Sequence, residues 1–141
     1  MIKKKKNLKN TLKIDALNMA IICNDLNTIR EMLLNNIDLN APDLYGFFPI
    51  MICMDYGNIE CLKVLLQHGA NPNVVDKRGY TPLMKALCKK YLPNRYLVIM
   101  TLLRNGADTN IISNDSKTAL YLAKVHHPRY IQVLKRFGAE Y

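Results

Sequence analysis

The chain contains no tryptophan and no apolar run that approaches the roughly eighteen residues of a membrane span. No signal peptide is visible, because Lys3 to Lys6 are followed by polar residues and not by an apolar segment. We therefore expect a soluble, cytoplasmic protein with no membrane span.

The sequence also lacks the patterns of common catalytic sites. It has no phosphate-binding glycine loop, no G-x-S-x-G motif and no HExxH motif. His126 and His127 stand side by side, but no cysteine or acid lies at ligand spacing beside them. The prediction is a protein that is not an enzyme and that has no catalytic residue, no metal and no cofactor.

The four cysteines show no CxxC spacing. A zinc site or a disulfide framework needs closer or paired spacing. Cys53 aligns with Ala20, Ala86 and Ala123 of the other repeats, so we expect it to pack as a small buried side chain. We further expect four reduced thiols. These residues are Cys23, Cys53, Cys61 and Cys88.

Acidic residues are unevenly distributed. Residues 1–13 hold six lysines and no acid, and residues 76–141 hold twelve basic and four acidic side chains. Residues 14–75 carry seven acidic and two basic side chains, and the formal net charge is +9. This distribution favours steering of a partner with mixed charge or contact with an anionic surface. The simpler alternative is that the charges are solvated helix faces.

Residues 1–10 form a lysine-rich lead. We expect it to be flexible, because a like-charged run repels itself and buries little apolar surface. Such a run also suits nuclear import or contact with phosphates.

What the sequence does contain is a pattern that recurs after 33 residues. Asp76 opens D-K-R-G-Y-T-P-L-M-K-A, in which a turn glycine, a capping threonine and a helix-starting proline follow in order. Asp43 opens the matching D-L-Y-G-F-F-P-I-M-I-C. The copies close with L-L-R-N-G-A-D-T-N and L-L-Q-H-G-A-N-P-N, in which the glycine suits a left-handed helix end. Weaker copies precede and follow, so four units cover most of the chain.

A period of about 33 residues with a turn and two helices per unit is typical of ankyrin repeats. Residues 81–83 resemble the Thr-Pro-Leu element of that family, and residues 69–73 and 106–110 resemble its Gly-Ala-Asp-x-Asn element. The resemblance implies an all-α ankyrin-repeat solenoid of four helix-turn-helix units with short hairpin loops. We place the flexible basic lead at 1–10 and the ankyrin-repeat domain at 11–141, with repeats at about 11–42, 43–75, 76–112 and 113–141.

The end repeats depart from the pattern as capping units do. In the first, Asn24 and Asn36 stand where later copies have glycine, and asparagine tolerates a left-handed turn. In the last, Ser116 replaces the hairpin glycine, and Lys135 stands where Leu66 and Leu103 stand. We expect no further unit to follow, because a polar residue at that position does not pack against a neighbour.

The third repeat has four extra residues around Lys89 to Tyr96. Pro93 cannot continue a helix interior, so the insertion either lengthens the loop between the helices or adds a turn to the first helix. An insertion of this kind is either a working surface or neutral drift in a tolerant loop, and both interpretations stay open.

In the ankyrin family, partners are usually held on the face formed by hairpin tips and first helices. Carried over to this sequence, that face places large apolar side chains on the second hairpin, where exposed aromatics indicate a contact site. We predict that the partner-binding residues are Leu44, Tyr45, Phe47, Tyr56, Lys77, Arg78, Tyr80 and Lys89. The alternative is that Tyr45 or Phe47 folds back over a neighbouring hairpin and stabilises the stack.

The resemblance implies a non-catalytic protein–protein interaction module on a monomeric scaffold, with another protein as partner. Abundant Asn, Lys and Ile resemble the short ankyrin chains of large DNA viruses and intracellular bacteria, which favours a host-directed inhibitor or adaptor in the host cytoplasm or nucleus. One alternative is a basic surface that binds nucleic acid or an anionic surface, although the lysine lead lacks interleaved aromatics. Another is a structural subunit of a larger assembly.

Overall fold

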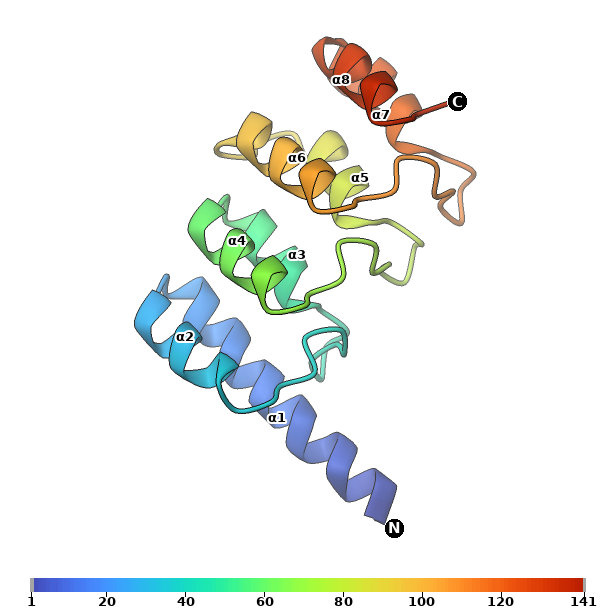
Figure 1. Ribbon diagram of the computed structural model, residues 1–141. Helices are drawn as coiled ribbons and strands as arrows, with labels where there is room; N and C mark the ends of the chain where they lie inside the picture. The colour runs from blue at the N-terminus through green and yellow to red at the C-terminus, as the bar shows by residue number, and fades with distance from the viewer. Residues whose placement is uncertain (1, 141) are drawn as a thin grey trace. The chain divides into compact units, whose positions relative to one another are not determined.

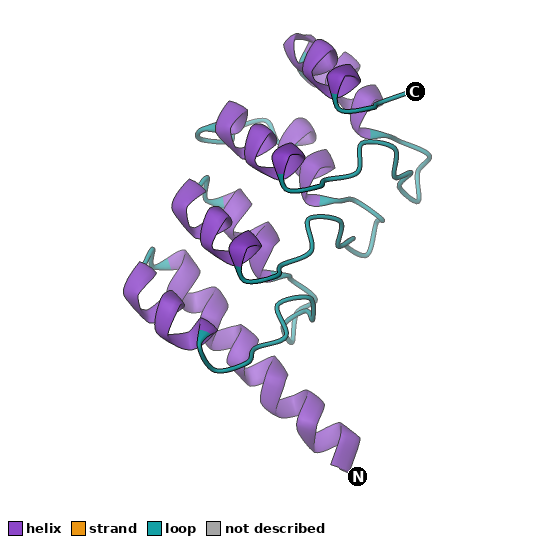
Figure 2. Ribbon diagram, viewed as in Figure 1, coloured by secondary structure: helices purple, strands orange, loops and turns teal. Residues whose placement is uncertain are grey.

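The computed structural model describes residues 2–140, which form helices joined by loops (Figure 1, Figure 2). The chain divides into two compact units, residues 1–71 and 72–141. Within the described residues, no helix is long and apolar enough to cross a membrane.

The first unit contains two antiparallel helix pairs. Its helices are α1 (Ile2–Ile22), α2 (Leu26–Leu33), α3 (Pro49–Asp55) and α4 (Ile59–Gln67). Helix α1 packs against α2 and α3, and α3 packs against α4. The apolar residues that recur at helical spacing form the core, since Leu17, Ile21, Ile29, Met54 and Leu65 are at most 1% exposed.

Helix α1 differs from the expectation of a separate flexible lead, because it begins at Ile2 and continues without a break to Ile22. The segment contains no glycine or proline, and lysine and leucine are good helix formers. The helix can therefore extend beyond the part that is anchored by Ile14, Leu17 and Ile21, all of which are buried.

The turns that end the first two helices are as predicted. Asn24 and Asn36 have φ angles of 56° and 46°, in the left-handed region. Asp25 then caps α2, because its side chain accepts hydrogen bonds from the backbone N–H and the hydroxyl of Thr28.

The expectation that no cysteine is paired is wrong for two of the four. The structure joins Cys53 of α3 to Cys61 of α4, with the two Cα atoms 6.0 Å apart. Two antiparallel helices joined by a short turn bring together residues that lie about one turn before and one turn after the connection. Cysteines eight residues apart can therefore pair without CxxC spacing. Cys23 and Cys88 are free.

The second unit repeats the helix pair and ends in a broken helix. Its elements are α5 (Pro82–Cys88), α6 (Arg95–Arg104), α7 (Ala119–His126), the 3₁₀ helix η1 (Pro128–Tyr130) and α8 (Ile131–Arg136). The insertion of the third repeat therefore lengthens the loop between α5 and α6 and does not add a turn. The last helical segment of the chain divides into η1 and α8.

Asparagine side chains tie successive loops together within each unit. Asn73 donates through Nδ2 to the carbonyl of Gly106 at 3.0 Å and accepts through Oδ1 from the N–H of Asp108 at 2.7 Å. Asn40 makes the same pair of bonds to Gly69 and Asn71, and Asn110 makes it to Gly138 and Glu140. Each amide therefore satisfies two backbone groups at the end of the following helix pair.

Candidate partner-binding surface

The hairpin of the first unit is built around Asp43. Its Oδ1 accepts hydrogen bonds from the N–H groups of Tyr45 (2.9 Å) and Phe47 (2.8 Å), and its Oδ2 accepts one from Nδ2 of Asn18 at 2.9 Å. Asp15 of α1 accepts a further bond from the N–H of Leu44 at 3.3 Å. The hairpin backbone is thus fixed to α1 by carboxylates and an amide.

This fixed hairpin presents large apolar side chains to solvent. Leu44 is 61% exposed, Tyr45 76% and Phe47 46%, and Tyr56, which follows α3, is 56% exposed. Neither Tyr45 nor Phe47 folds back into a buried position. The predicted exposure of these four residues is therefore present, while their contact with a partner stays a prediction.

Helix α1 adds an apolar stripe that sequence analysis did not include. Leu8 (54%), Leu12 (54%), Met19 (58%) and Ile22 (39%) are exposed, and with Asp15 they follow a spacing of 4, 3, 4 and 3 residues along one helix face. That spacing was the available signal. The assignment of residues 1–10 to a flexible lead removed Leu8 from this pattern.

An open pocket of about 770 Å³ lies beside the hairpin. Its lining includes Asn10 and Thr11 of α1, Asp38 and Pro42 of the loop after α2, and Leu44 of the hairpin. The exposed side chain of Leu44 therefore stands at the edge of a hollow with both polar and apolar walls, which suits an inserted side chain of a partner.

The hairpin of the second unit repeats the same construction with Asp76. Its Oδ1 accepts from the N–H groups of Arg78 and Tyr80, both at 2.9 Å. Gly79 has a φ of 76°, and a Cβ there would lie 2.7 Å from Oδ1 of Asn114. Glycine is required at this position by the left-handed backbone and by the close approach of the next hairpin.

Tyr80 is not part of an exposed aromatic group, which corrects the prediction made for it. Its side chain is 4% exposed, and its hydroxyl donates to Oδ2 of Asp115 at 3.0 Å. The guanidinium of Arg78 lies 4.6 Å from the centre of the Tyr80 ring. The tyrosine turns inward because the next hairpin supplies an acceptor for its hydroxyl, and no feature of the third repeat alone indicates this.

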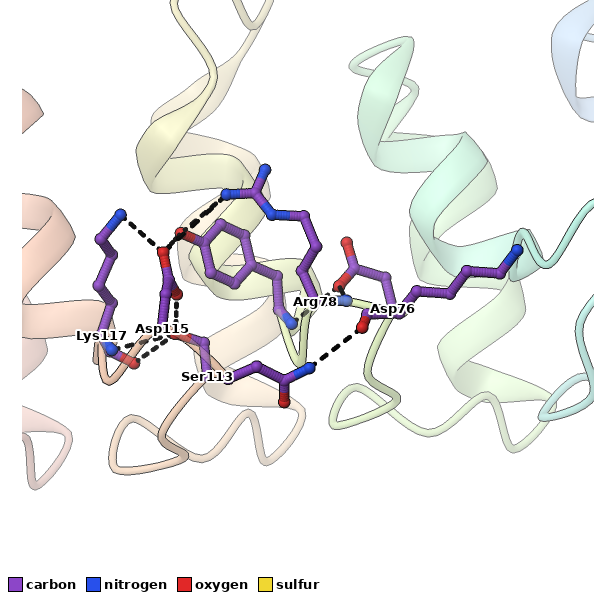
Figure 3. Close-up of polar contacts among 8 residues, drawn as sticks. Asp76, Arg78, Ser113, Asp115 and Lys117 are labelled. Atoms are coloured by element: carbon purple, nitrogen blue, oxygen red, sulfur yellow. Dashed lines mark hydrogen bonds and ion pairs between the residues drawn. The ribbon is translucent and has the colours of Figure 1, made fainter.

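Asp115 collects the polar contacts of this region, with Arg78 and Lys117 approaching from opposite sides (Figure 3). Nζ of Lys117 lies 2.7 Å and Nη2 of Arg78 lies 4.0 Å from Oδ2, and the Ser113 hydroxyl donates to Oδ1 at 2.6 Å. The hydrogen bonds from Lys117, Ser113 and Tyr80 hold the pKa of Asp115 well below its ordinary value. The same contact with Asp115 raises the pKa of Lys117.

Two overlapping stretches of the chain, residues 1–76 and 17–113, match the family described as ankyrin repeats in three copies. The chain belongs to the ankyrin-repeat family. Its all-α repeat fold agrees with the prediction from the sequence. Ankyrin repeats are generally non-catalytic modules for protein–protein interaction.

Relatives of this ankyrin chain include mammalian and viral proteins. It is 30% identical over 130 residues to the ankyrin repeat, SAM and basic leucine zipper domain-containing protein 1 of Dasypus novemcinctus, covering 91% of this chain and 27% of that protein. It is 33% identical over 103 residues to ankyrin repeat protein OPG189 of Variola virus, covering 71% of this chain and 18% of that protein. The chain thus spans about a quarter or less of the length of these relatives.

The remaining predicted residues of the ankyrin face differ in exposure. Lys77 and Arg78 are exposed on the hairpin of the second unit, whereas Lys89 is half-buried just after α5. Leu44, Tyr45, Phe47 and Tyr56 belong to the first unit, and Lys77, Arg78, Tyr80 and Lys89 belong to the second. Each unit therefore offers its own surface, apolar in the first and cationic in the second.

Proposed function

We propose that the chain is a non-catalytic interaction module that binds another protein through the apolar surface of its first unit. This surface, called the hairpin surface below, consists of Leu44, Tyr45, Phe47 and Tyr56 together with the α1 stripe Leu8, Leu12, Met19 and Ile22. The observation that carries the proposal is the exposure of these side chains on α1, at the end of α3 and on a hairpin whose backbone is fixed by Asp15, Asn18 and Asp43.

A rigid hairpin favours binding for an energetic reason. Association loses free energy when flexible loops and side chains become ordered. Here the hydrogen bonds of Asp43 already fix the turn, so covering Tyr45 and Phe47 removes apolar surface from water with little additional ordering. Large aromatic side chains in such positions dominate the energy of many interfaces.

The partner is proposed to be a host protein, with the chain acting as an inhibitor or an adaptor in the host cytoplasm or nucleus. Two observations support a host-directed role: the 33% identity to a Variola virus ankyrin protein and the composition rich in Asn, Lys and Ile. A monomeric scaffold is proposed for the same chain.

The test is affinity capture from host-cell lysate, followed by titration of the captured protein once it is identified. Tyr45→Ala and Phe47→Ala should each weaken binding by about tenfold or more, as expected for interface hot spots. Tyr121→Ala is the matched control, because Tyr121 is 47% exposed on α7 of the other unit. The proposal fails if the hairpin variants lower the melting temperature and leave the affinity unchanged.

A basic surface for nucleic acid is the second candidate function. Residues 77–107 contain seven basic and no acidic side chains, which supports this alternative. Binding of this kind weakens steeply with salt, because it releases counterions. A mobility-shift assay that shows no complex with nucleic acid at low salt would exclude this candidate function.

A further inference from the structure

The loop between α5 and α6 is held in one shape by two buried side chains. Leu92 and Arg95 are each 8% exposed, and Asn94 between them adopts the left-handed conformation with a φ of 53°. The extra residues of the third repeat are therefore part of the folded structure. Their backbone is anchored at both ends.

Arg95 anchors the start of this loop. Its Nη2 donates to the carbonyls of Lys89 (2.5 Å) and Lys90 (3.3 Å), and its Nη1 contacts the ring of His127. Its Nε has no hydrogen-bond partner among the described residues, and burial lowers the pKa of the guanidinium. Burying a cation without a carboxylate partner costs free energy. In return, the buried Arg95 side chain fixes the backbone of the lengthened loop.

The anchored loop and the first turn of α6 present apolar side chains to solvent. Tyr91 is 82% exposed, Tyr96 55% and Leu97 50%. Lys90 is exposed beside Tyr91, and Lys89 is half-buried. We call Lys90, Tyr91, Tyr96 and Leu97 the insertion surface. In Figure 2 the α5–α6 connection lies at the opposite end of the second unit from its hairpin loops.

The charge around the insertion surface is of one sign. Between Asp76 and Asp108 there are seven basic and no acidic residues, and between Asp115 and Glu140 there are five basic and no acidic residues. The helices α5, α6, α7 and α8 and the 3₁₀ helix η1 all lie in these two stretches. Within the described residues, the helices of the second unit therefore carry basic side chains and no acidic ones.

We propose that the insertion surface binds an acidic segment of a partner protein, one that carries leucine or an aromatic side chain between its acids. Tyr91, Tyr96 and Leu97 supply apolar contact area, and Lys90 orients the segment and raises its association rate. A protein segment fits better than a nucleic acid. The guanidinium of Arg95 is used by backbone carbonyls, and Leu97 gives an aliphatic contact that stacking on bases does not use.

The probe is a short fluorescent peptide in which aspartate and glutamate alternate with leucine and phenylalanine. A second peptide carries asparagine and glutamine in place of the acids, and a single-stranded oligonucleotide matches the charge of the first. Anisotropy titrations of the full chain should show binding of the acidic peptide, weaker binding of the neutral one, and an affinity that falls as salt rises.

Tyr91→Ala should lower the affinity for the acidic peptide by about tenfold, and Leu97→Ala by a smaller factor. Both residues are on the surface, so both variants should keep the wild-type melting temperature. Tyr121→Ala and the pair Tyr45→Ala and Phe47→Ala should leave the affinity unchanged. The insertion surface is therefore tested separately from the hairpin surface.

Three results would overturn the proposal. One is no binding of the acidic peptide at about 1 mM, which is weaker than useful recognition. Another is equal binding by wild type and Tyr91→Ala. The third is an oligonucleotide that binds more tightly than the acidic peptide and that loses affinity in the Tyr91→Ala variant. That result would assign the surface to nucleic acid.

Discussion

Asp115 shows how one carboxylate shapes the candidate surface of the second unit. It accepts from Tyr80, Ser113 and Lys117 and lies near Arg78. Arg78 and Lys117 both lie near the single carboxylate of Asp115, so this region keeps a net positive charge. The hydrogen bond from Tyr80 to Asp115 holds the tyrosine in a buried position.

The depressed pKa of Asp115 predicts a specific sensitivity to acid. A folded-state pKa below the ordinary value of about 3.9 means that the unfolded chain binds the proton first as pH falls. The contribution of Asp115 to stability is therefore present above about pH 4 and is lost as pH falls through the folded pKa. Urea unfolding between about pH 5 and pH 2 should show a shallower decline for Asp115→Asn than for wild type.

Lys117→Met provides the control for this prediction, because it removes the partner that lowers the pKa most. It should also make the decline shallower, and combining it with Asp115→Asn should add little further change. Equal slopes for wild type and Asp115→Asn would mean that these hydrogen bonds do not persist in solution.

At the scale of the element, helix starts differ between the repeats. Thr81 accepts from the N–H of Met84 at 3.2 Å and caps α5, and Thr118 caps α7 in the same way through Tyr121. Phe48, at the matching position before α3, makes no side-chain cap. Helix α3 begins nevertheless, because Pro49 fits the first helical position and Ile50 and Met54 are buried.

Thr81→Ala should lower the free energy of unfolding by about 1 kcal/mol, because the N–H of Met84 loses its acceptor. Thr81→Ser keeps the hydroxyl and should recover most of that loss. Urea unfolding followed by circular dichroism measures both variants. If the serine variant is as destabilised as the alanine variant, the methyl group and not the cap is responsible.

The sequence predicted the repeated elements well and the packing between them less well. Helix α4 and the turns at Asn24 and Asn36 follow from local signals, namely a cap, a left-handed position and an apolar period. The burial of Tyr80 and the pairing of Cys53 with Cys61 depend on residues from another helix or hairpin. Repeat spacing carries no information about such side-chain partners.

The extent of α1 was missed for a different reason. A lysine run indicates disorder when nothing adjoins it, but a helix that is already nucleated and buried through Ile14, Leu17 and Ile21 adds residues at little cost. Treating residues 1–10 as a separate lead removed Leu8 from the stripe that it forms with Leu12, Met19 and Ile22. That stripe enlarges the hairpin surface beyond the residues that the sequence predicted.

For the whole molecule, charge divides unequally between the two units. Residues 1–71 hold eight basic and seven acidic side chains, for a net charge of +1, and residues 72–141 hold twelve basic and four acidic side chains, for +8. Charge of one sign destabilises a folded unit through repulsion among its own side chains. The ion pairs of Asp76 and Asp115 offset little of this, because ion pairs that solvent screens contribute little to stability.

Salt should therefore stabilise the second unit more than the first. Raising NaCl from about 10 mM to about 150 mM shortens the screening length from about 30 Å to about 8 Å, which weakens repulsion across the unit. Hydrogen exchange should show a larger gain of amide protection in α5–α8 than in α1–α4, with the first unit as the internal control in the same sample. A loss of protection in α5–α8 with added salt would mean that the attractions of Asp76 and Asp115 outweigh the repulsion among the twelve basic residues.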